Sequence, residues 1–325
     1  MSDLSKVFAA NPDRRYIMFG GKGGLGKTTF SAATGYWLAQ QGHRVLVFSV
    51  DPQASLSDIF QRDIFGQGPV KIMDNLWAQE IDADSHIKAY QQEIRQKILD
   101  MYGFTEVPEE IENYIQAASA EPAMEESAIF DAVVDIVVAG DYDYYIYDLV
   151  PLGHALYYLS MAKVYDEWIN KITKLREEMR EYEQVASVMK RQKLTEEDQI
   201  LGELTLIKTR INASSQILTD KLKTAFFFVV VPEDMIILDT QKAAGLFAKF
   251  DVPIAGYVVN RVVPAELAQQ NVPEYLKNRI TMQQKYMGTI RDAFGQQVLA
   301  YVPELERDVT GLPAIERLAG IMYGD

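Results

Sequence analysis

The chain has 325 residues with 32 basic and 46 acidic side chains, and therefore a formal net charge of −14. A surface this negative repels polyanions, so we expect neither nucleic acid nor an anionic membrane as a general partner. The sequence contains no cysteine, which excludes disulfides, thiolate catalysis and cysteine-bound zinc. We find neither a signal-like amino-terminal segment nor an apolar run of bilayer-spanning length, so we expect a cytoplasmic protein without stable membrane insertion.

Apolar runs that alternate with helical stretches predict the fold class. Tyr16–Phe19 is a short apolar strand, Thr28–Gln41 has helical character and Arg44–Val50 is again an apolar strand. Further strands of this kind are predicted at Tyr144–Val150, Ala225–Val231, Ile254–Val259 and Gln297–Tyr301. Strands that are apolar on both faces are typical of a parallel sheet covered by helices. We therefore expect an α/β fold with a doubly wound, mostly parallel sheet, and a single domain over residues 1–325.

Two long helical insertions interrupt this alternation, at roughly residues 85–138 and 161–222. In the second, apolar residues recur four and three apart from Trp168 to Met189 and again from Ile200 to Leu218, which is typical of a helical hairpin with a narrow apolar seam. Two interpretations stay open for the apolar side chains of both insertions. They line a groove for a foreign hydrophobic helix, or they pack against the chain's own helices.

The stretch from Gly21 to Thr28 reads GKGGLGKT and fits the pattern G-x-x-x-x-G-K-[ST] between a predicted strand and a predicted helix. Glycines allow the backbone to curl so that successive N–H groups face a phosphate, and the helix N-terminus adds favourable partial charge. We expect Lys27 to reach the β- and γ-phosphates and Thr28 to ligate Mg²⁺. The residues expected to bind nucleotide here are Gly21, Gly23, Gly24, Leu25, Gly26, Lys27, Thr28 and Thr29. An incidental glycine-rich turn would not require the lysine, the threonine and this context together, so the sequence predicts a P-loop NTPase.

Two aspartates follow predicted strands. Asp51 comes after Arg44–Val50, at the edge where open α/β sheets place ligands, and a carboxylate there can orient a water for attack on the γ-phosphate. The alternative role for Asp51 is a helix N-cap before Pro52. Asp148 ends an apolar strand, where a carboxylate is costly to bury without a cation. The expected magnesium ligands, in part through water, are Thr28, Asp51 and Asp148.

Lys22 follows the first glycine of the motif, so that the stretch GGKGGLGKTT resembles the deviant P-loop class, whose extra lysine contacts nucleotide across a dimer interface. A solvated surface lysine is the alternative. Beyond this stretch the chain resembles the ArsA-type family, which comprises arsenite-pump ATPases and ATPases that target tail-anchored membrane proteins. Four further stretches carry the resemblance in the family's order: SVDPQASLSD at 49–58, DLVPLGH at 148–154, VVNR at 258–261 and YVPELERDVTG at 301–311.

The resemblance implies roles for single residues around the phosphates. It makes Asp51 the catalytic aspartate, with Lys27 and Lys22 as the other catalytic residues. Gly153 is expected to present its N–H to the γ-phosphate, because glycine permits close backbone approach.

The resemblance also implies a site for the base. Asn260 would contact adenine, with Arg261 and Pro303 as further nucleotide-binding residues. Without the resemblance, Asn260 would be an ordinary turn residue.

The chain departs from the family's pattern at two places. Leu149, Val150 and Leu152 replace two threonines and an alanine of the second switch motif. In the targeting branch a C-x-x-C pair clasps zinc between subunits, but the two cysteine positions are Pro273 and Leu276 here, so no zinc is expected. Arsenite pumps of the family bind the metalloid through thiolates, which this chain lacks.

We expect a cytoplasmic, Mg²⁺-dependent ATP hydrolase that forms a homodimer and couples its nucleotide state to binding of a hydrophobic membrane-protein client, such as a tail-anchored protein, or of a membrane-associated receptor. Three alternatives stay open. They are an ATPase subunit of an anion or arsenite efflux pump, a partitioning or positioning ATPase, and a nucleotide-dependent regulator that binds a partner protein.

Overall fold

The computed structural model describes residues 3–50, 54–82, 132–148 and 216–324 except 218, together with isolated residues between 85 and 209. The two predicted insertions fall almost entirely outside these ranges and stay predictions. The last part of the first insertion is described, and residues 132–139 are helical there, directly before a central strand.

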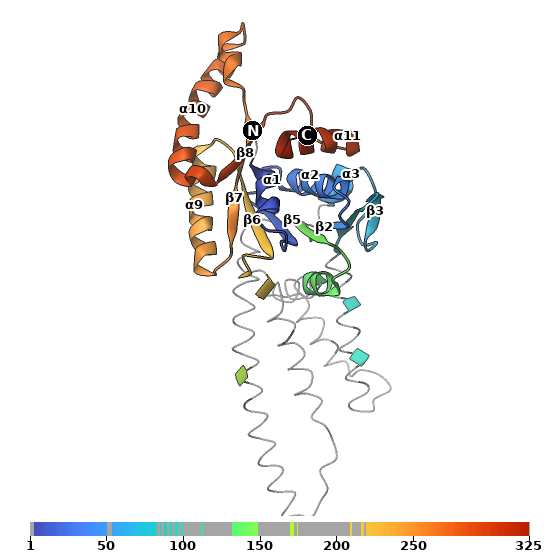
Figure 1. The fold of residues 1–325 in the computed structure, drawn as a ribbon. Coiled ribbons are helices and arrows are strands. Elements are labelled where there is room, and N and C mark those ends of the chain that lie inside the picture. Colours follow the sequence, from blue (N-terminus) through green and yellow to red (C-terminus); the bar gives the residue numbers. More distant parts are fainter. Residues whose placement is uncertain are drawn as a thin grey trace, which may run out of the picture.

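An eight-stranded sheet forms the centre of the molecule, with the strand order β3-β4-β2-β5-β1-β6-β7-β8 (Figure 1). Its strands are β1 (Tyr16–Gly20), β2 (Val45–Ser49), β3 (Val70–Met73), β4 (Leu76–Glu80), β5 (Tyr144–Asp148), β6 (Thr224–Val230), β7 (Ile254–Val262) and β8 (Val298–Pro303). All neighbouring pairs are parallel except β3 with β4. The predicted doubly wound, mostly parallel sheet is therefore confirmed.

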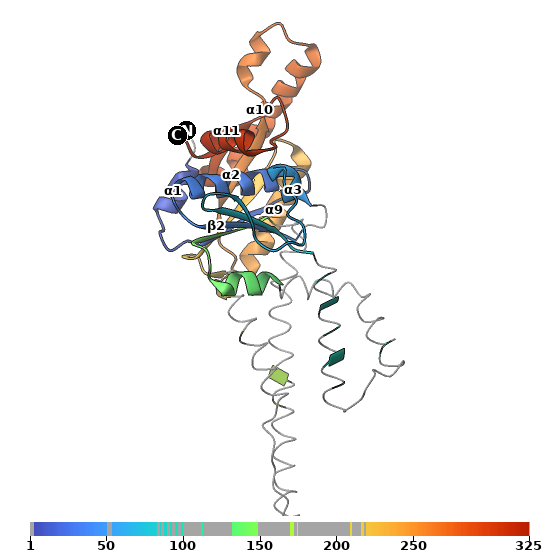
Figure 2. The same cartoon turned by 90° about the vertical axis from the view of Figure 1, so that its right-hand side faces the viewer.

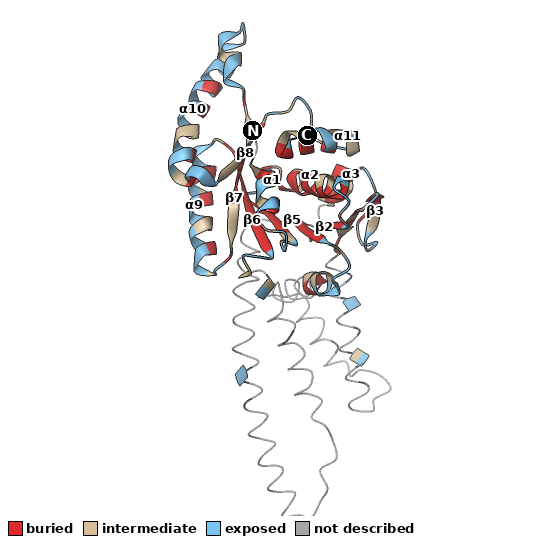
Figure 3. Cartoon of the chain, viewed as in Figure 1, coloured by how far each residue is buried: buried red, intermediate tan, exposed pale blue. Residues whose placement is uncertain are grey.

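The central strands are apolar because helices cover both of their faces. Every residue of β2, β5 and β6 is buried. Phe19 of β1 stacks on Phe227 of β6, with ring centroids 5.3 Å apart. Figure 3 shows this buried layer along the strands and on the sheet-facing sides of the helices.

The β3–β4 hairpin at the sheet edge is a feature that the apolar runs did not predict. Strand β4 alternates between buried and half-buried residues, and β3 buries only Ile72, as in a sheet edge with one covered face. Asn75 closes the turn with a φ of 64°, a left-handed conformation that asparagine tolerates.

Helices cover the sheet on both faces (Figures 1 and 2). One face carries α1 (Leu4–Ala9), α2 (Lys27–Gln40), α3 (Ser55–Phe60) and α11 (Leu312–Tyr323). The other carries the helical residues 132–139, α9 (Asp234–Lys249) and α10 (Glu274–Phe294). Two 3₁₀ turns complete the described elements, η1 (Ala265–Gln269) and η2 (Gly295–Gln297). In the part of the chain that the structure describes, each helix is too short or too polar to traverse a lipid bilayer.

Candidate nucleotide site

The carboxyl ends of β1, β2, β5 and β7 share one edge of the sheet because these strands run parallel. From β1 the chain crosses through α2, on one face, to β2; from β6 it crosses through α9, on the other face, to β7. The direction of winding therefore reverses beside β1. Open α/β sheets bind ligands in the crevice at such a switch point.

The glycine-rich loop after β1 owes its shape to glycines that other residues cannot replace without strain. Gly26 has a φ of 97°, and a Cβ there would lie 2.8 Å from the side-chain nitrogen of Asn260. At Gly21 an added Cβ would lie 2.8 Å from the carbonyl oxygen of Val229. Above Gly23 and Gly24, in contrast, the space within 4 Å of such a Cβ is empty, which leaves room for a ligand to approach the backbone.

Helix α2 begins directly at the end of this loop. Its N-cap is Gly26, and no side chain caps the helix, so its first N–H groups are available to an anion. Lys27 is 8% exposed, and its Nζ donates a hydrogen bond to the carbonyl oxygen of Lys22, 3.3 Å away. Thr28 and Thr29 are half-buried in the first turn of the helix. A loop with open backbone, an uncapped helix and an inward lysine fits a polyphosphate.

Asp148 ends β5 beside the loop and is 3% exposed. In the sheet it lies opposite Phe19 of β1 and Ser49 of β2. Ser31, one turn into α2, donates a hydrogen bond to its carboxylate over 3.4 Å. Among the described residues no three carboxylates or histidines gather to hold a metal by themselves. A buried carboxylate beside a loop that fits a polyphosphate suits Mg²⁺, which takes one or two carboxylates together with phosphate oxygens.

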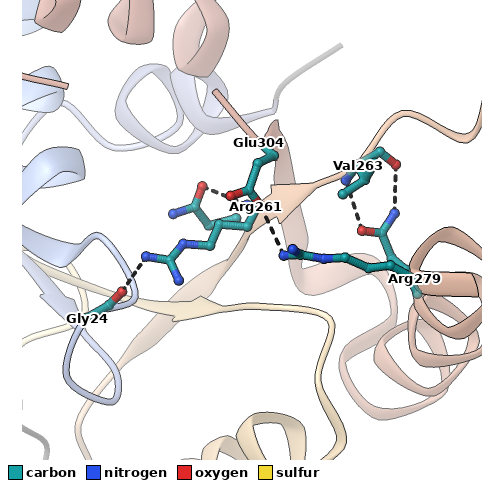
Figure 4. Close-up of polar contacts among 7 residues, drawn as sticks. Gly24, Arg261, Val263, Arg279 and Glu304 are labelled. Carbon is teal, nitrogen blue, oxygen red and sulfur yellow. Dashed lines mark hydrogen bonds and ion pairs between the residues drawn. The ribbon is translucent and has the colours of Figure 1, made fainter. Parts of the chain in front are cut away.

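Asn260 and Arg261 contact the glycine-rich loop directly. The Asn260 amide donates a hydrogen bond of 2.8 Å to the Leu25 carbonyl. The Arg261 guanidinium donates one of 2.8 Å to the Gly24 carbonyl (Figure 4). Arg261 has a φ of 57°, and its N–H donates to the side-chain oxygen of Asn260. The end of β7 therefore supports the glycine-rich loop, a contact that sequence patterns did not predict.

Lys22 lies on the surface and forms an ion pair with Asp239 of α9, 3.0 Å from nitrogen to oxygen. Both side chains are partly exposed, Lys22 to 55% and Asp239 to 38%. Sequence reasoning missed Asp239, because nothing near it marks a partner for a lysine 217 residues earlier.

Pro303 ends β8, where the next residue, Glu304, donates its N–H to the Val262 carbonyl over 3.0 Å. The Arg279 guanidinium of α10 donates to the Glu304 carboxylate at 3.5 Å. Gln283 makes two hydrogen bonds to the backbone of Val263 (Figure 4). These contacts join α10 and β8 to the end of β7. Asp51 and Gly153 lie outside the described residues, so their predicted roles stay predictions.

Comparison with known proteins agrees with this geometry. A family model described as anion-transporting ATPase matches residues 14–324. A protein of Aquifex aeolicus with the provisional name arsenical pump-driving ATPase 1 is 34% identical over 318 residues, which cover 96% of this chain and 79% of that protein.

Two eukaryotic relatives match at lower identity. ATPase ASNA1 homolog 2 of Paramecium tetraurelia is 27% identical over 330 residues, covering 99% of this chain and 97% of that protein. ATPase GET3C of Arabidopsis thaliana is 26% identical over 339 residues, covering 99% and 85%. The chain therefore belongs to the ArsA family of ATPases, which is described as the anion-transporting ATPase family.

Proposed function

We propose that this ATPase works as a Mg²⁺-dependent homodimer whose nucleotide state controls the binding of a hydrophobic client, such as a tail-anchored membrane protein. The observation that carries the nucleotide part is the open glycine-rich loop between β1 and α2, with Lys27 directed inward and Asp148 buried beside it. The backbone N–H groups of this loop and of the first turn of α2 hold the phosphates.

Each residue of the site takes a defined part in hydrolysis. Lys27 exchanges the Lys22 carbonyl for phosphate oxygens, since a charge-assisted hydrogen bond is stronger than one to a neutral carbonyl. Thr28 and Asp148 would hold Mg²⁺, in part through water, and the ion would supply positive charge to neutralise the phosphates. Asp51 orients the attacking water, and the Gly153 N–H contacts the γ-phosphate. Asn260, Arg261 and Pro303 lie beside the base.

The homodimer is supported by the position of Lys22. It stands after the first glycine of the loop, yet its side chain points to the surface, where it pairs with Asp239. A lysine so placed can reach a phosphate held by a second copy of the chain. Such a contact adds positive charge from outside the subunit, as an arginine finger supplied by a partner does in other P-loop enzymes.

A hydrophobic client is supported by what the chain lacks and by its relatives. Without cysteine, the thiolate chemistry that binds a metalloid in the pump branch is absent. The relatives from Paramecium and Arabidopsis carry the ASNA1 and GET3 names and align over 99% of this chain. The name of the Aquifex relative favours a second candidate, an ATPase subunit of an anion or arsenite efflux pump.

The catalytic assignment is tested with Asp51→Asn. We expect this variant to bind MgATP with unchanged affinity in calorimetry and to lose nearly all turnover, since an amide positions water poorly beside a phosphoryl group. Turnover at the wild-type rate would refute the role given to Asp51.

The client is tested by pull-down with an apolar transmembrane peptide, with and without ATP, against a matched peptide interrupted by lysines. Nucleotide-dependent capture of the apolar peptide alone is expected. Stimulation of ATP hydrolysis by arsenite, without peptide capture, would instead favour the pump subunit.

A further inference from the structure

The loop between β2 and α3 carries Asp51, and both of its ends are attached where β4 ends. Ile81, the residue after β4, holds the start of the loop, and Glu80, the last residue of β4, holds its end. At its start, the Ser49 carbonyl accepts a hydrogen bond of 2.9 Å from the N–H of Ile81. At its end, the Leu56 N–H and the Ser57 hydroxyl each donate to one oxygen of the Glu80 carboxylate, both over 2.5 Å. Since Glu80 also pairs with Ser49 in the sheet, β4 fixes the distance between the two ends of the loop.

The start of helix α3 is capped in an unusual manner, by the side chain of Glu80 from another strand. Helix α3 follows Ala54, which has a φ of 52° and no side chain that can cap the first N–H groups. Serine or aspartate at that position would satisfy an N–H locally. Here a carboxylate that is 1% exposed does so from a separate strand, although burying a charge costs several kcal/mol unless it is well paired. The arrangement therefore fixes where the helix begins relative to the sheet.

Helix α3 is also held beyond its first turn. The Ser57 hydroxyl accepts the N–H of Ile64 over 3.1 Å while it donates to Glu80. At the other end, the N–H of Gly311, which precedes α11, donates to the Ile59 carbonyl over 2.8 Å. Residues outside α3 therefore hold the helix at both of its ends, and Glu80 is the one at the end that follows the loop.

We propose that Glu80 is a positioning residue for ATP hydrolysis, which sets the place of Asp51 relative to the phosphates by anchoring the end of its loop. The inference rests on the role proposed for Asp51. In this role Glu80 contacts neither the nucleotide nor the attacking water. Displacing a catalytic group by about 1 Å can cost about a hundredfold in rate, so an anchor outside the site can control turnover.

The test is Glu80→Gln, which keeps the size of the side chain. Its amide oxygen can still accept the Leu56 N–H, but its NH₂ group then faces the Ser57 hydroxyl, which loses its acceptor. We expect kcat to fall about ten- to a hundredfold. The KM and the calorimetric affinity for MgATP stay within about twofold, since the glycine-rich loop is untouched. Hydrogen exchange at the Leu56 amide rises.

Two further variants separate an effect on positioning from a loss of stability. Ser57→Ala removes one of the two donors to Glu80 and should lower kcat several-fold without changing nucleotide affinity. Thr34→Val is the control for lost stability. It deletes two buried hydrogen bonds of the Thr34 hydroxyl, one of 2.6 Å with Tyr323 of α11 and one of 2.7 Å to the Phe30 carbonyl, and neither involves Glu80 or α3. This control should unfold more easily and keep the wild-type kcat.

The outcomes separate this inference from the proposed function. If Asp51→Asn is inactive while Glu80→Gln and Ser57→Ala keep the wild-type kcat, only the role of Glu80 is wrong. If Asp51→Asn is fully active, the catalytic assignment itself fails. Adding Glu80→Gln to Asp51→Asn should not lower the residual rate further, because both act through one carboxylate. A further drop of the same size as in the wild type would overturn the inference.

Discussion

The loops that follow β1 and β2 end at the same edge of the sheet but are built in different ways. The glycine-rich loop takes its path from its own residues, since Gly21 and Gly26 adopt backbone angles and close approaches that a side chain would prevent. The loop after β2 ends at Ala54, and the group that fixes it is Glu80, 24 residues beyond Leu56. One loop is encoded locally and the other by a tertiary contact.

This difference suits the two tasks proposed for the loops. A phosphate cradle must exist before the ligand arrives, because several N–H groups have to point to one place. A loop that carries a catalytic carboxylate must be placed accurately relative to the phosphates. The hydrogen bonds of Ser49, Leu56 and Ser57 to the end of β4 meet this demand.

The largest effect is expected from Gly26→Ala, which attacks the locally encoded loop. An alanine at a φ of 97°, with its Cβ 2.8 Å from the Asn260 amide, should lower the free energy of unfolding by about 1–3 kcal/mol and abolish MgATP binding. Denaturant titration and calorimetry measure both. Gly23→Ala is the matched control for stability, because no atom lies within 4 Å of its new methyl group and its φ is not positive. Equal stability of the two variants would contradict the claim that the glycine-rich loop takes its path from its own glycines.

The contrast between locally encoded structure and structure set by tertiary contacts also explains which elements could be predicted from the sequence. The strand predicted at Ala225–Val231 is observed at Thr224–Val230, one residue away at each end. The prediction succeeds because a strand buried on both faces consists of an unbroken run of apolar residues. The hairpin of β3 and β4 was missed, since a strand near the sheet edge such as LWAQE, second from the edge, mixes polar and apolar residues. Glu80 was missed with it, although this carboxylate is nearly as buried as the core around it.

Within the candidate site, motifs located the residues but not their contacts. The pattern of Gly21 to Thr28 depends on neighbours in the chain, and a sequence motif can therefore identify it. The hydrogen bond from Asn260 to Leu25 joins residues 235 positions apart, and no local pattern specifies it. Family resemblance assigned Asn260 to adenine, a role that stays a prediction, while the structure adds a second role for it as a support of the loop.

A smaller effect is expected from Asn260→Ala, which removes the long-range support of the locally encoded loop. Loss of its hydrogen bond to the Leu25 carbonyl should lower the free energy of unfolding by about 0.5–1.5 kcal/mol. Asn260→Asp should cost more, because an acceptor-only carboxylate then faces that carbonyl. Urea titration checks the order of the two variants. If aspartate were tolerated better than alanine, the amide would not support the loop in solution.

The smallest change in stability is expected from Asp239→Asn, which releases Lys22 from α9. A partly exposed ion pair contributes at most about 1 kcal/mol, so unfolding should hardly change. Affinity for MgATP should nevertheless rise, by up to about fivefold, because the Asp239 carboxylate no longer competes with phosphate for the lysine. The gain should shrink at high salt, which screens exposed charges. Asp74→Asn, which breaks the exposed pair with Lys71 in the β3–β4 turn, is the control and should leave affinity unchanged. If both variants bound MgATP alike, Lys22 would not exchange Asp239 for the nucleotide, and the contact between the loop and α9 would be structural only.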